Sequence, residues 1–221
     1  MKKAVEIIRA VFEAVLDVIL PLRARTVRTK SRALEDIPLS PTPHDLLGVR
    51  ITTLMNYRER AVVDLIQSLK YDGSAHAARL ASAVLADYLR EEISSAHTFS
   101  VRKIFLVPVP LHKHRANERG FNQIELVLKA LPQEFHNGVL SYMEANILER
   151  TRATKPQTRL PRSERLSNVA GAFAVADEQA IADAHVFLLD DVTTTGATLA
   201  NAATPLRRAG AKVTLLALAR A

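Results

Sequence analysis

Apolar residues along the chain gather into short continuous runs and longer helical stripes that follow one another. The continuous runs predict buried strands, because four or more apolar residues rich in β-formers suit a strand that is covered on both faces. Stripes at a spacing of three and four predict helices that bury one face. Strands are predicted at 50–57, 102–109, 145–149, 186–189 and 213–219, and helices at 59–70, 74–93, 122–130, 163–169 and 197–209.

This alternation of strands and helices predicts an α/β fold with parallel strand pairing and right-handed crossovers. Two helices separate the strand at 50–57 from the next clear strand, so we expect the core sheet to start late in the chain. Ligands of parallel sheets bind at the carboxyl ends of the strands. The polar residues that follow each strand are therefore the candidates for function.

The first 49 residues are expected to form an N-terminal region, and residues 50–221 the main domain. Residues 4–20 predict an amphipathic helix whose apolar stripe suits docking on the core. A membrane-surface or partner helix is the alternative, although its polar face carries charges of both signs. Pro21 and a basic run end this helix, and the segment up to Pro43 is predicted to be an extended linker or a degenerate small module.

Composition restricts the partners and the compartment. The net charge of +7 over 221 residues favours anionic partners, which include phosphorylated small molecules, nucleic acid and acidic surfaces. The sequence has no cysteine, which excludes disulfides and thiolate zinc sites and favours a cytoplasmic location. Charged residues interrupt the N-terminal apolar stretch at helical spacing, and no uncharged run is long enough to span a bilayer, so we expect neither a signal peptide nor insertion into a membrane.

The strand at 186–189 runs into the most informative stretch of the sequence. Asp190 and Asp191 follow that strand, and a turn of threonines that ends in Gly196 leads into the helix from Ala197. Free N–H groups at a helix start bind phosphate, while two carboxylates accept hydrogen bonds from vicinal ribose hydroxyls. The simpler alternative is that Asp191 and the threonines only end the strand and cap the helix. The phosphoribosyl-binding candidates are Asp190, Asp191, Thr193, Thr194, Thr195, Gly196, Ala197 and Thr198.

A second candidate site is the basic loop after the strand at 102–109. In a parallel sheet this loop is expected at the same edge as Asp190 and Asp191, where its donors would hold pyrophosphate oxygens. The alternative is a solvated basic turn. The pair His112 and His114 lacks further ligands at a recognisable spacing, so no direct metal site is predicted. The pyrophosphate-loop candidates are Pro108, Val109, Pro110, Leu111, Lys113 and Arg115.

Residues 188–198 resemble the phosphoribosyl-pyrophosphate (PRPP) signature of the type I phosphoribosyltransferases. With further motifs in the same order, the chain resembles the ComF family, which is also called amidophosphoribosyltransferase-like. These further motifs are Leu69-Lys70-Tyr71, Pro108-Val109-Pro110-Leu111-His112, Glu118-Arg119-Gly120-Phe121-Asn122-Gln123, Pro156-Gln157, Arg165-x-x-Asn168 and Gly171-Ala172-Phe173. The resemblance implies the type I phosphoribosyltransferase fold, with a mostly parallel sheet flanked by helices. It also implies that the loop Arg119, Gly120, Phe121, Asn122 and Gln123 lies over the PRPP pocket.

Many members of this family begin with a four-cysteine zinc module. Here Ala24 and Val27 stand where the first Cys-x-x-Cys pair would be expected, so the module is absent or rebuilt without metal, and no zinc is expected.

Two functions remain open at this point. The first is a protein that binds PRPP or a ribose 5-phosphate with Mg²⁺ and transfers the phosphoribosyl group, with Asp190 and Asp191 as the catalytic carboxylates. The second is a non-enzymatic accessory protein of the DNA-uptake machinery, with single-stranded DNA and a DNA-uptake helicase as partners. Aromatic residues make up only 5% of the chain, which leaves few groups on which bases could stack.

Overall fold

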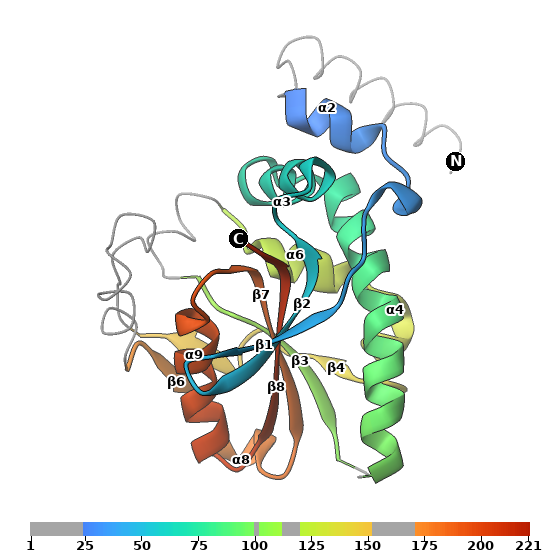
Figure 1. The fold of residues 1–221 in the computed structure, drawn as a ribbon. Helices are drawn as coiled ribbons and strands as arrows, with labels where there is room; N and C mark the ends of the chain where they lie inside the picture. Colours follow the sequence, from blue (N-terminus) through green and yellow to red (C-terminus); the bar gives the residue numbers. More distant parts are fainter. Residues whose placement is uncertain (1–23, 100–101, 112–119, 152–170) are drawn as a thin grey trace.

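A six-stranded sheet with helices on both faces forms the centre of the protein (Figure 1). The computed structural model describes residues 24–99, 102–111, 120–151 and 171–221. The described elements are α2 (Ala24–Lys30), η1 (Leu34–Asp36), β1 (Thr42–Leu46), β2 (Val49–Asn56), α3 (Arg60–Asp72), α4 (Ala75–Phe99), β3 (Ile104–Pro108), α6 (Gln123–Lys129), η2 (Gln133–Phe135), β4 (Tyr142–Met143), β5 (Leu148–Arg150), β6 (Phe173–Val175), α8 (Glu178–Ile181), β7 (His185–Thr193), α9 (Ala197–Arg208) and β8 (Lys212–Arg220).

The large sheet has the strand order β1-β2-β8-β7-β3-β4. Pairing is parallel from β2 to β4, and only the edge pair of β1 and β2 is antiparallel within this sheet. Leu47 and Gly48 join those two strands with positive φ at both residues, as a type I′ turn requires. The predicted α/β class, with a mostly parallel sheet flanked by helices, is confirmed.

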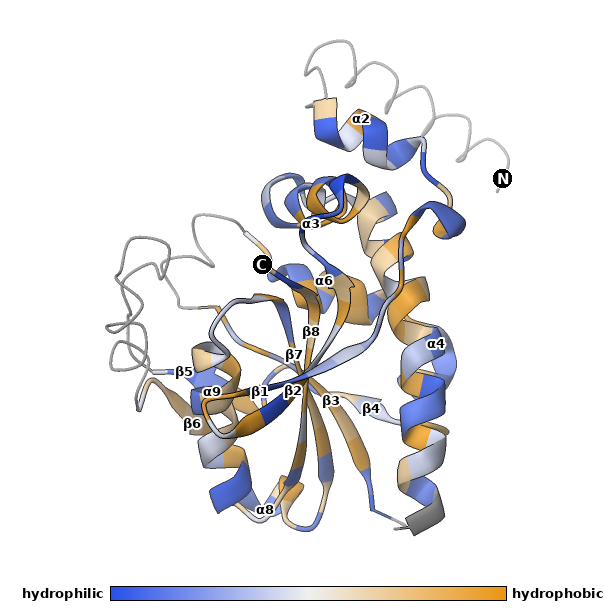
Figure 2. Ribbon diagram, viewed as in Figure 1, coloured by the Kyte–Doolittle hydropathy of each residue, from blue (hydrophilic) through white to orange (hydrophobic). Residues whose placement is uncertain are grey.

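The core is divided by the sheet into two layers. Phe187 and Leu189 of β7 belong to the layer under α3, α4 and α6, whereas Val186 and Leu188 belong to the layer under α9. This follows from the period of two in a strand, which sends successive side chains to opposite faces. The central strands are accordingly apolar along most of their length, as Figure 2 shows for β3, β7 and β8.

Several predicted elements need correction. Strand β2 lies inside the sheet, between β1 and β8, so the prediction that the core sheet starts late is wrong. The strand predicted at 145–149 is observed as β5, which pairs with β6 in a separate two-stranded sheet. The helices predicted at 4–20 and 163–169 lie outside the described residues.

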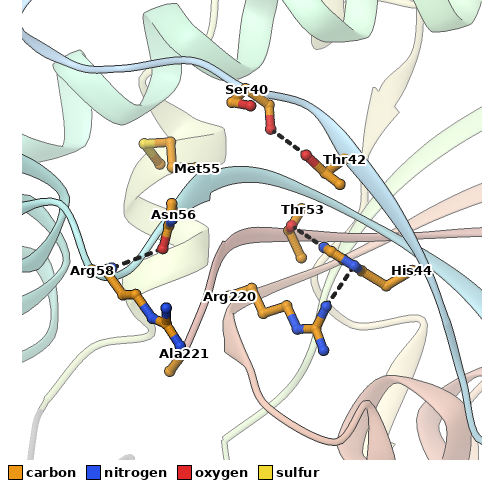
Figure 3. Close-up of a pocket in the computed structure, with 9 residues that line it drawn as sticks. All are labelled: Ser40, Thr42, His44, Thr53, Met55, Asn56, Arg58, Arg220 and Ala221. Atoms are coloured by element: carbon orange, nitrogen blue, oxygen red, sulfur yellow. Dashed lines mark hydrogen bonds between the residues drawn. The ribbon is translucent and has the colours of Figure 1, made fainter.

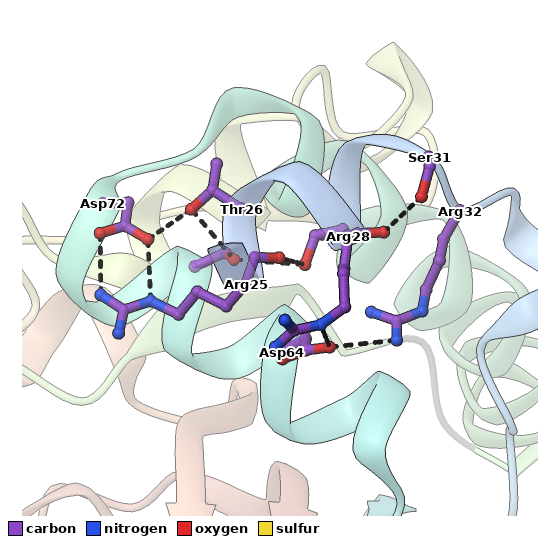
Figure 4. Close-up of polar contacts among 9 residues, drawn as sticks. Arg25, Thr26, Arg28, Ser31, Arg32, Asp64 and Asp72 are labelled. Atoms are coloured by element: carbon purple, nitrogen blue, oxygen red, sulfur yellow. Dashed lines mark hydrogen bonds and ion pairs between the residues drawn. The ribbon is translucent and has the colours of Figure 1, made fainter. Parts of the chain in front are cut away.

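The segment predicted as an extended linker contains a helix and a strand. Strand β1 pairs with β2 and is part of the main sheet. Helix α2 packs on α3 through polar contacts, which Figure 4 shows. Arg25 pairs with Asp72 at 2.9 Å, and Asp64 accepts hydrogen bonds from Arg28 at 2.6 and 2.9 Å. A polar interface of this kind leaves no apolar stripe, which explains why the hydrophobic pattern did not predict α2.

The described residues show neither a metal cluster nor a membrane-spanning helix. No group of three or more His, Asp or Glu side chains within residues 24–99, 102–111, 120–151 and 171–221 is arranged to hold a metal ion. None of the helices that the structure describes is both long enough and apolar enough to cross a bilayer.

Candidate phosphate and ribose site

The two carboxylates of the signature, Asp190 and Asp191, lie within strand β7 rather than after it. Asp190 pairs with Ala217 of β8, and the ladder continues to Thr193 opposite Arg220. The sequence had placed the end of the strand at Leu189, so this boundary is a correction. Because neighbouring residues of a strand face opposite sides, the carboxylates of Asp190 and Asp191 leave the sheet in different directions. The two carboxylates therefore have different surroundings.

Asp191 faces the layer of α3 and α6 and is only 7% exposed. Its Oδ2 accepts a hydrogen bond from Nε2 of Gln123 at 2.8 Å and lies 3.7 Å from Nζ of Lys70. Its Oδ1 accepts the backbone N–H of Val192 at 2.7 Å. Both oxygens thus have partners, and Asp191 connects the end of β7 to two helices.

Asp190 is half-buried, and its Oδ1 accepts the backbone N–H of Asp191 at 2.9 Å. Burial, followed by the negative charge of Asp191, raises the pKa of Asp190 to about 7. Lys70 acts in the opposite direction but more weakly. A carboxyl that titrates near neutral pH is able to accept a hydrogen bond from a sugar hydroxyl when ionised and to donate one when protonated.

The turn after β7 is packed tightly against the β1–β2 hairpin. Gly196 has a φ of +80°, and a Cβ atom there would lie 2.7 Å from Cδ1 of Ile51 and 3.0 Å from Cβ of Leu46. Only glycine meets both the backbone conformation and the close approach. Oγ1 of Thr195 accepts the N–H of Ala197 at 3.4 Å, and Thr194 is exposed. The turn therefore presents the first N–H groups of α9, a helix of 12 residues, with its positive dipole end.

The loop after β3 emerges beside the signature, as predicted. Pro108 pairs with Leu189, and the N–H of Val109 donates to the carbonyl of Leu189 at 2.8 Å. Val109 consequently lies next to Asp190 at the same edge of the sheet. Of the pyrophosphate-loop candidates the structure describes Pro108, Val109, Pro110 and Leu111, whereas Lys113 and Arg115 lie outside the described residues, as do His112 and His114.

The loop at 119–123, which is predicted to lie over the PRPP pocket, ends in contacts with both neighbouring segments. Asn122 caps α6 by accepting the N–H of Ile124 at 3.0 Å, and its Nδ2 donates to the carbonyl of Val109 at 3.1 Å. Gln123 adds the bond to Asp191 that was described above. The ring of Phe121 lies against Gly73 at the end of α3, where a Cβ would be 3.0 Å from Cε1 of Phe121. Gly120 is exposed, and Arg119 lies outside the described residues.

Three residues of this arrangement were not assigned a site role from the sequence. Lys70 reaches Asp191 from the last turn of α3, and the only signal for it was its place in the Leu69-Lys70-Tyr71 motif. Leu46 and Ile51 support the turn at Gly196 from the hairpin. Their contact joins segments about 150 residues apart, and nothing in the local pattern indicates it.

A cavity of about 480 Å³ opens between the β3 loop and β5. Its walls include Pro110, Phe121 and Asn122 on one side and Asn146 and Arg150 on the other. Ligand cavities of small molecules have volumes in this range. The cavity adjoins the candidate site, because Pro110 follows Val109 directly.

The chain is similar in sequence to several known proteins. The chain is 32% identical to the DNA utilization protein YhgH of Escherichia coli K12 over 163 residues, which are 73% of this chain and 67% of that protein. It is 34% identical to competence protein F of Haemophilus influenzae over 52% of this chain and 50% of that protein. Identity to competence protein ComFC of Streptococcus pneumoniae is 29%, over 75% of this chain and 66% of that protein. No family model matches the chain.

The parallel sheet, with a glycine turn and helix start after β7, defines a protein with a type I phosphoribosyltransferase-like fold. Within that class, the similarity to YhgH over two thirds of its length shows that the chain belongs to the ComF family.

Proposed function

We propose that the protein binds PRPP or a related ribose 5-phosphate, together with Mg²⁺, at the carboxyl edge of β7 and β3. The observation that carries this proposal is the pair of hydrogen bonds from Gln123 to Asp191 and from Asn122 to Val109. These bonds hold the three segments that resemble PRPP-binding motifs together at one edge of the sheet.

Each segment suits a different part of the ligand. The N–H groups between Thr194 and Thr198 suit the 5-phosphate, because a helix start favours an anion. Asp190 suits the ribose hydroxyls, and Asp191 supports it from the other side of the strand. The loop Pro108–Leu111, continued by Lys113 and Arg115 in the sequence, suits the pyrophosphate.

Mg²⁺ would enter this site bound to the pyrophosphate of the ligand rather than held by protein ligands alone. Carboxylate oxygens are ligands that Mg²⁺ prefers, and Asp190 and Asp191 are the acidic groups at this edge of the described structure. When bound with pyrophosphate, the ion neutralises charge on the leaving group. The residues that would hold the complex are Asp190 and, in the β3 loop, Leu111 through its N–H, because Pro108 and Pro110 have no N–H and that of Val109 donates to Leu189.

The same residues support phosphoribosyl transfer. The bond between the anomeric carbon and the pyrophosphate oxygen breaks, and its electron pair leaves with pyrophosphate. Positive charge then develops on the ribose, and the nearby ionised Asp190 stabilises it. The acceptor completes the reaction by forming a bond to the anomeric carbon, and the cavity beside Phe121 and Asn146 has room for one.

Titration calorimetry with PRPP and Mg²⁺ tests the proposal. We expect wild type to release heat with a saturating curve and Asp190→Asn to bind about tenfold more weakly or worse, because a carboxylate that accepts sugar hydroxyls is lost. Asp87→Asn, an exposed carboxylate on α4 that pairs with Arg90, is the matched control and should bind as wild type does. Equal heats for wild type and Asp190→Asn would refute the proposal.

The names of the relatives favour a second function. One is called a DNA utilization protein and others competence proteins, and the chain carries a net charge of +7. We propose as the alternative that the chain binds single-stranded DNA as an accessory protein of DNA uptake. A gel shift with single-stranded DNA that weakens steeply as salt rises would support it. An absent shift would reject it.

A further inference from the structure

A second cavity of about 480 Å³ lies at the same edge of the sheet, on the side of the β1–β2 hairpin (Figure 3). It is formed by β1, by the end of β2 and by the end of β8. Its lining is polar and basic, with His44, Thr53, Asn56, Arg58 and Arg220 among the wall residues. It belongs neither to the signature turn nor to the β3 loop.

A chain of hydrogen bonds fixes the position of Arg220. Nη1 of Arg220 donates to Nδ1 of His44 at 2.6 Å, because arginine has only donors. His44 therefore accepts on Nδ1, and its Nε2–H donates to Oγ1 of the buried Thr53 at 3.0 Å. Burial, and then the charge of Arg220, lower the pKa of His44, which keeps the ring neutral. Figure 3 shows His44 between Thr53 and Arg220.

The guanidinium of Arg220 has most of its donors left for a ligand. Of its five N–H groups, the described contacts use the one that faces His44. Within the described ranges, neither Arg220 nor Arg58 has a carboxylate within 4 Å. The pocket thus holds two guanidinium groups that no Asp or Glu side chain of the described residues neutralises, and one of them is pre-oriented. Two guanidinium groups beside a hollow of this size match a phosphate oxyanion.

The pocket is coupled to β7 through the backbone. Arg220 pairs with Thr193, and the N–H of Ala221 donates to the carbonyl of Thr193 at 3.1 Å. Thr193 is the residue that leads into the signature turn. A group bound by Arg220 would therefore lie at the end of β8, which is the neighbour of the strand β7 that carries Asp190.

We propose that this pocket is a second phosphate-binding site, which takes the phosphate of a nucleotide unit, either free or within a single strand of DNA. The guanidinium groups of Arg58 and Arg220 hold the oxyanion, and the rest of the cavity takes the attached sugar. The proposal does not depend on PRPP binding at Asp190.

The test compares two pocket variants with a control arginine that lies away from the pocket. Arg58→Gln and Arg220→Gln are expected to weaken the binding of thymidine 5′-monophosphate or of a short oligothymidylate about fivefold each. Arg50→Gln removes an arginine at the opposite end of β2, where it pairs only with the exposed Asp45. This control should bind as wild type does. Thermal unfolding of each variant verifies that the fold is retained.

A second measurement reports the pocket directly. The NMR signals of the His44 imidazole are identified by their loss in His44→Gln. They should shift when either probe is added, and they should still shift in the Asp190→Asn variant. If the binding of both probes weakens when Arg58 or Arg220 is replaced, a free nucleotide is a sufficient ligand. If only the binding of the oligothymidylate weakens, the ligand is the phosphodiester of a strand. Either result supports the site. Binding that ignores both substitutions, or His44 signals that stay unchanged, would overturn it.

Discussion

Gln123 donates a hydrogen bond from Nε2 to Oδ2 of Asp191 across 2.8 Å, and this contact joins residues 68 positions apart. It ties the first turn of α6 to the end of β7. The neighbouring Asn122 ties the same turn to Val109, at the end of β3. The signature segment, the β3 loop and the start of α6 are thus connected by direct side-chain contacts.

Loss of the Gln123 contact should cost stability. Gln123→Ala leaves a nearly buried oxygen of Asp191 with Lys70, at 3.7 Å, as its nearest remaining side-chain partner. An unsatisfied buried acceptor costs about 1–3 kcal/mol, so we expect the free energy of unfolding, measured with urea, to fall by that amount and the midpoint to fall with it. Gln123→Glu should be at least as damaging, because it places a like charge against Asp191. Unchanged midpoints for both variants would show that the contact contributes nothing.

A comparison of two glycines isolates the close packing of the signature turn. Gly196 and Gly48 have similar positive φ values, +80° and +75°, but a Cβ at Gly48 would meet nothing within 4 Å. Both Gly→Ala substitutions carry backbone strain of about 1 kcal/mol. Only Gly196→Ala also collides with Ile51 and Leu46. We expect it to lose about 1–3 kcal/mol more than Gly48→Ala by urea unfolding. Equal losses would contradict the packing described here.

The raised pKa of Asp190 predicts a pH dependence of stability. The folded state keeps a proton on Asp190 up to about pH 7, whereas the unfolded chain releases it at the ordinary value for a carboxyl. Stability then falls as pH rises through this window, because the folded state binds more protons. Asp190→Asn lacks this titration, so wild type should lose about 1–2 kcal/mol relative to it between pH 4 and pH 7. Urea unfolding at several pH values measures the difference, and a constant difference would argue against a raised pKa.

The polar interface of α2 with α3 predicts the opposite pH response. Asp64 has a side chain only 4% exposed, and the hydrogen bond from Arg28 is the main cause that lowers its pKa. Asp64→Asn should cost about 2–4 kcal/mol at neutral pH, since a nearly buried anion with two arginine partners is lost. This loss should vanish as pH falls below the ordinary carboxyl value and through the lowered pKa of Asp64.

The matched control for this prediction is Asp45→Asn, in the exposed pair with Arg50. That pair should be worth less than about 0.5 kcal/mol. If the two variants lose the same amount in thermal or urea unfolding, α2 is not anchored through Asp64.

The apolar pattern of the sequence was sufficient for the interior of the fold. The runs that became β3, β7 and β8 are covered on both faces, so their composition alone marks them as strands. The pattern failed where polar residues take part in the sheet. Residues 190–193 extend β7 because they pair with β8 as far as Arg220. The polar side chains of this segment do not indicate that it pairs with a neighbouring strand.

Edges and polar interfaces were also hidden from the sequence. Strand β1 contains Pro43, which is tolerated because an edge strand needs fewer ladder donors. Helix α2 is held by Arg25 and Arg28 on acidic residues of α3, so no periodic apolar residues mark it. For the candidate site, the order of the motifs predicted the edge on which it lies. The contacts that join the motifs, such as Gln123 with Asp191, depend on tertiary structure.

We propose that the turn between β7 and α9 and the loop after β3 form one site for PRPP. A crystal structure of the protein with PRPP and Mg²⁺ tests it most directly. We predict the 5-phosphate on the N–H groups of Thr194–Thr198, a ribose hydroxyl on Asp190 and the pyrophosphate along Val109–Leu111. PRPP found only in the pocket of His44 and Arg220, or absent from the turn at saturating concentration, would rule out a PRPP site at the carboxyl edge of β7 and β3.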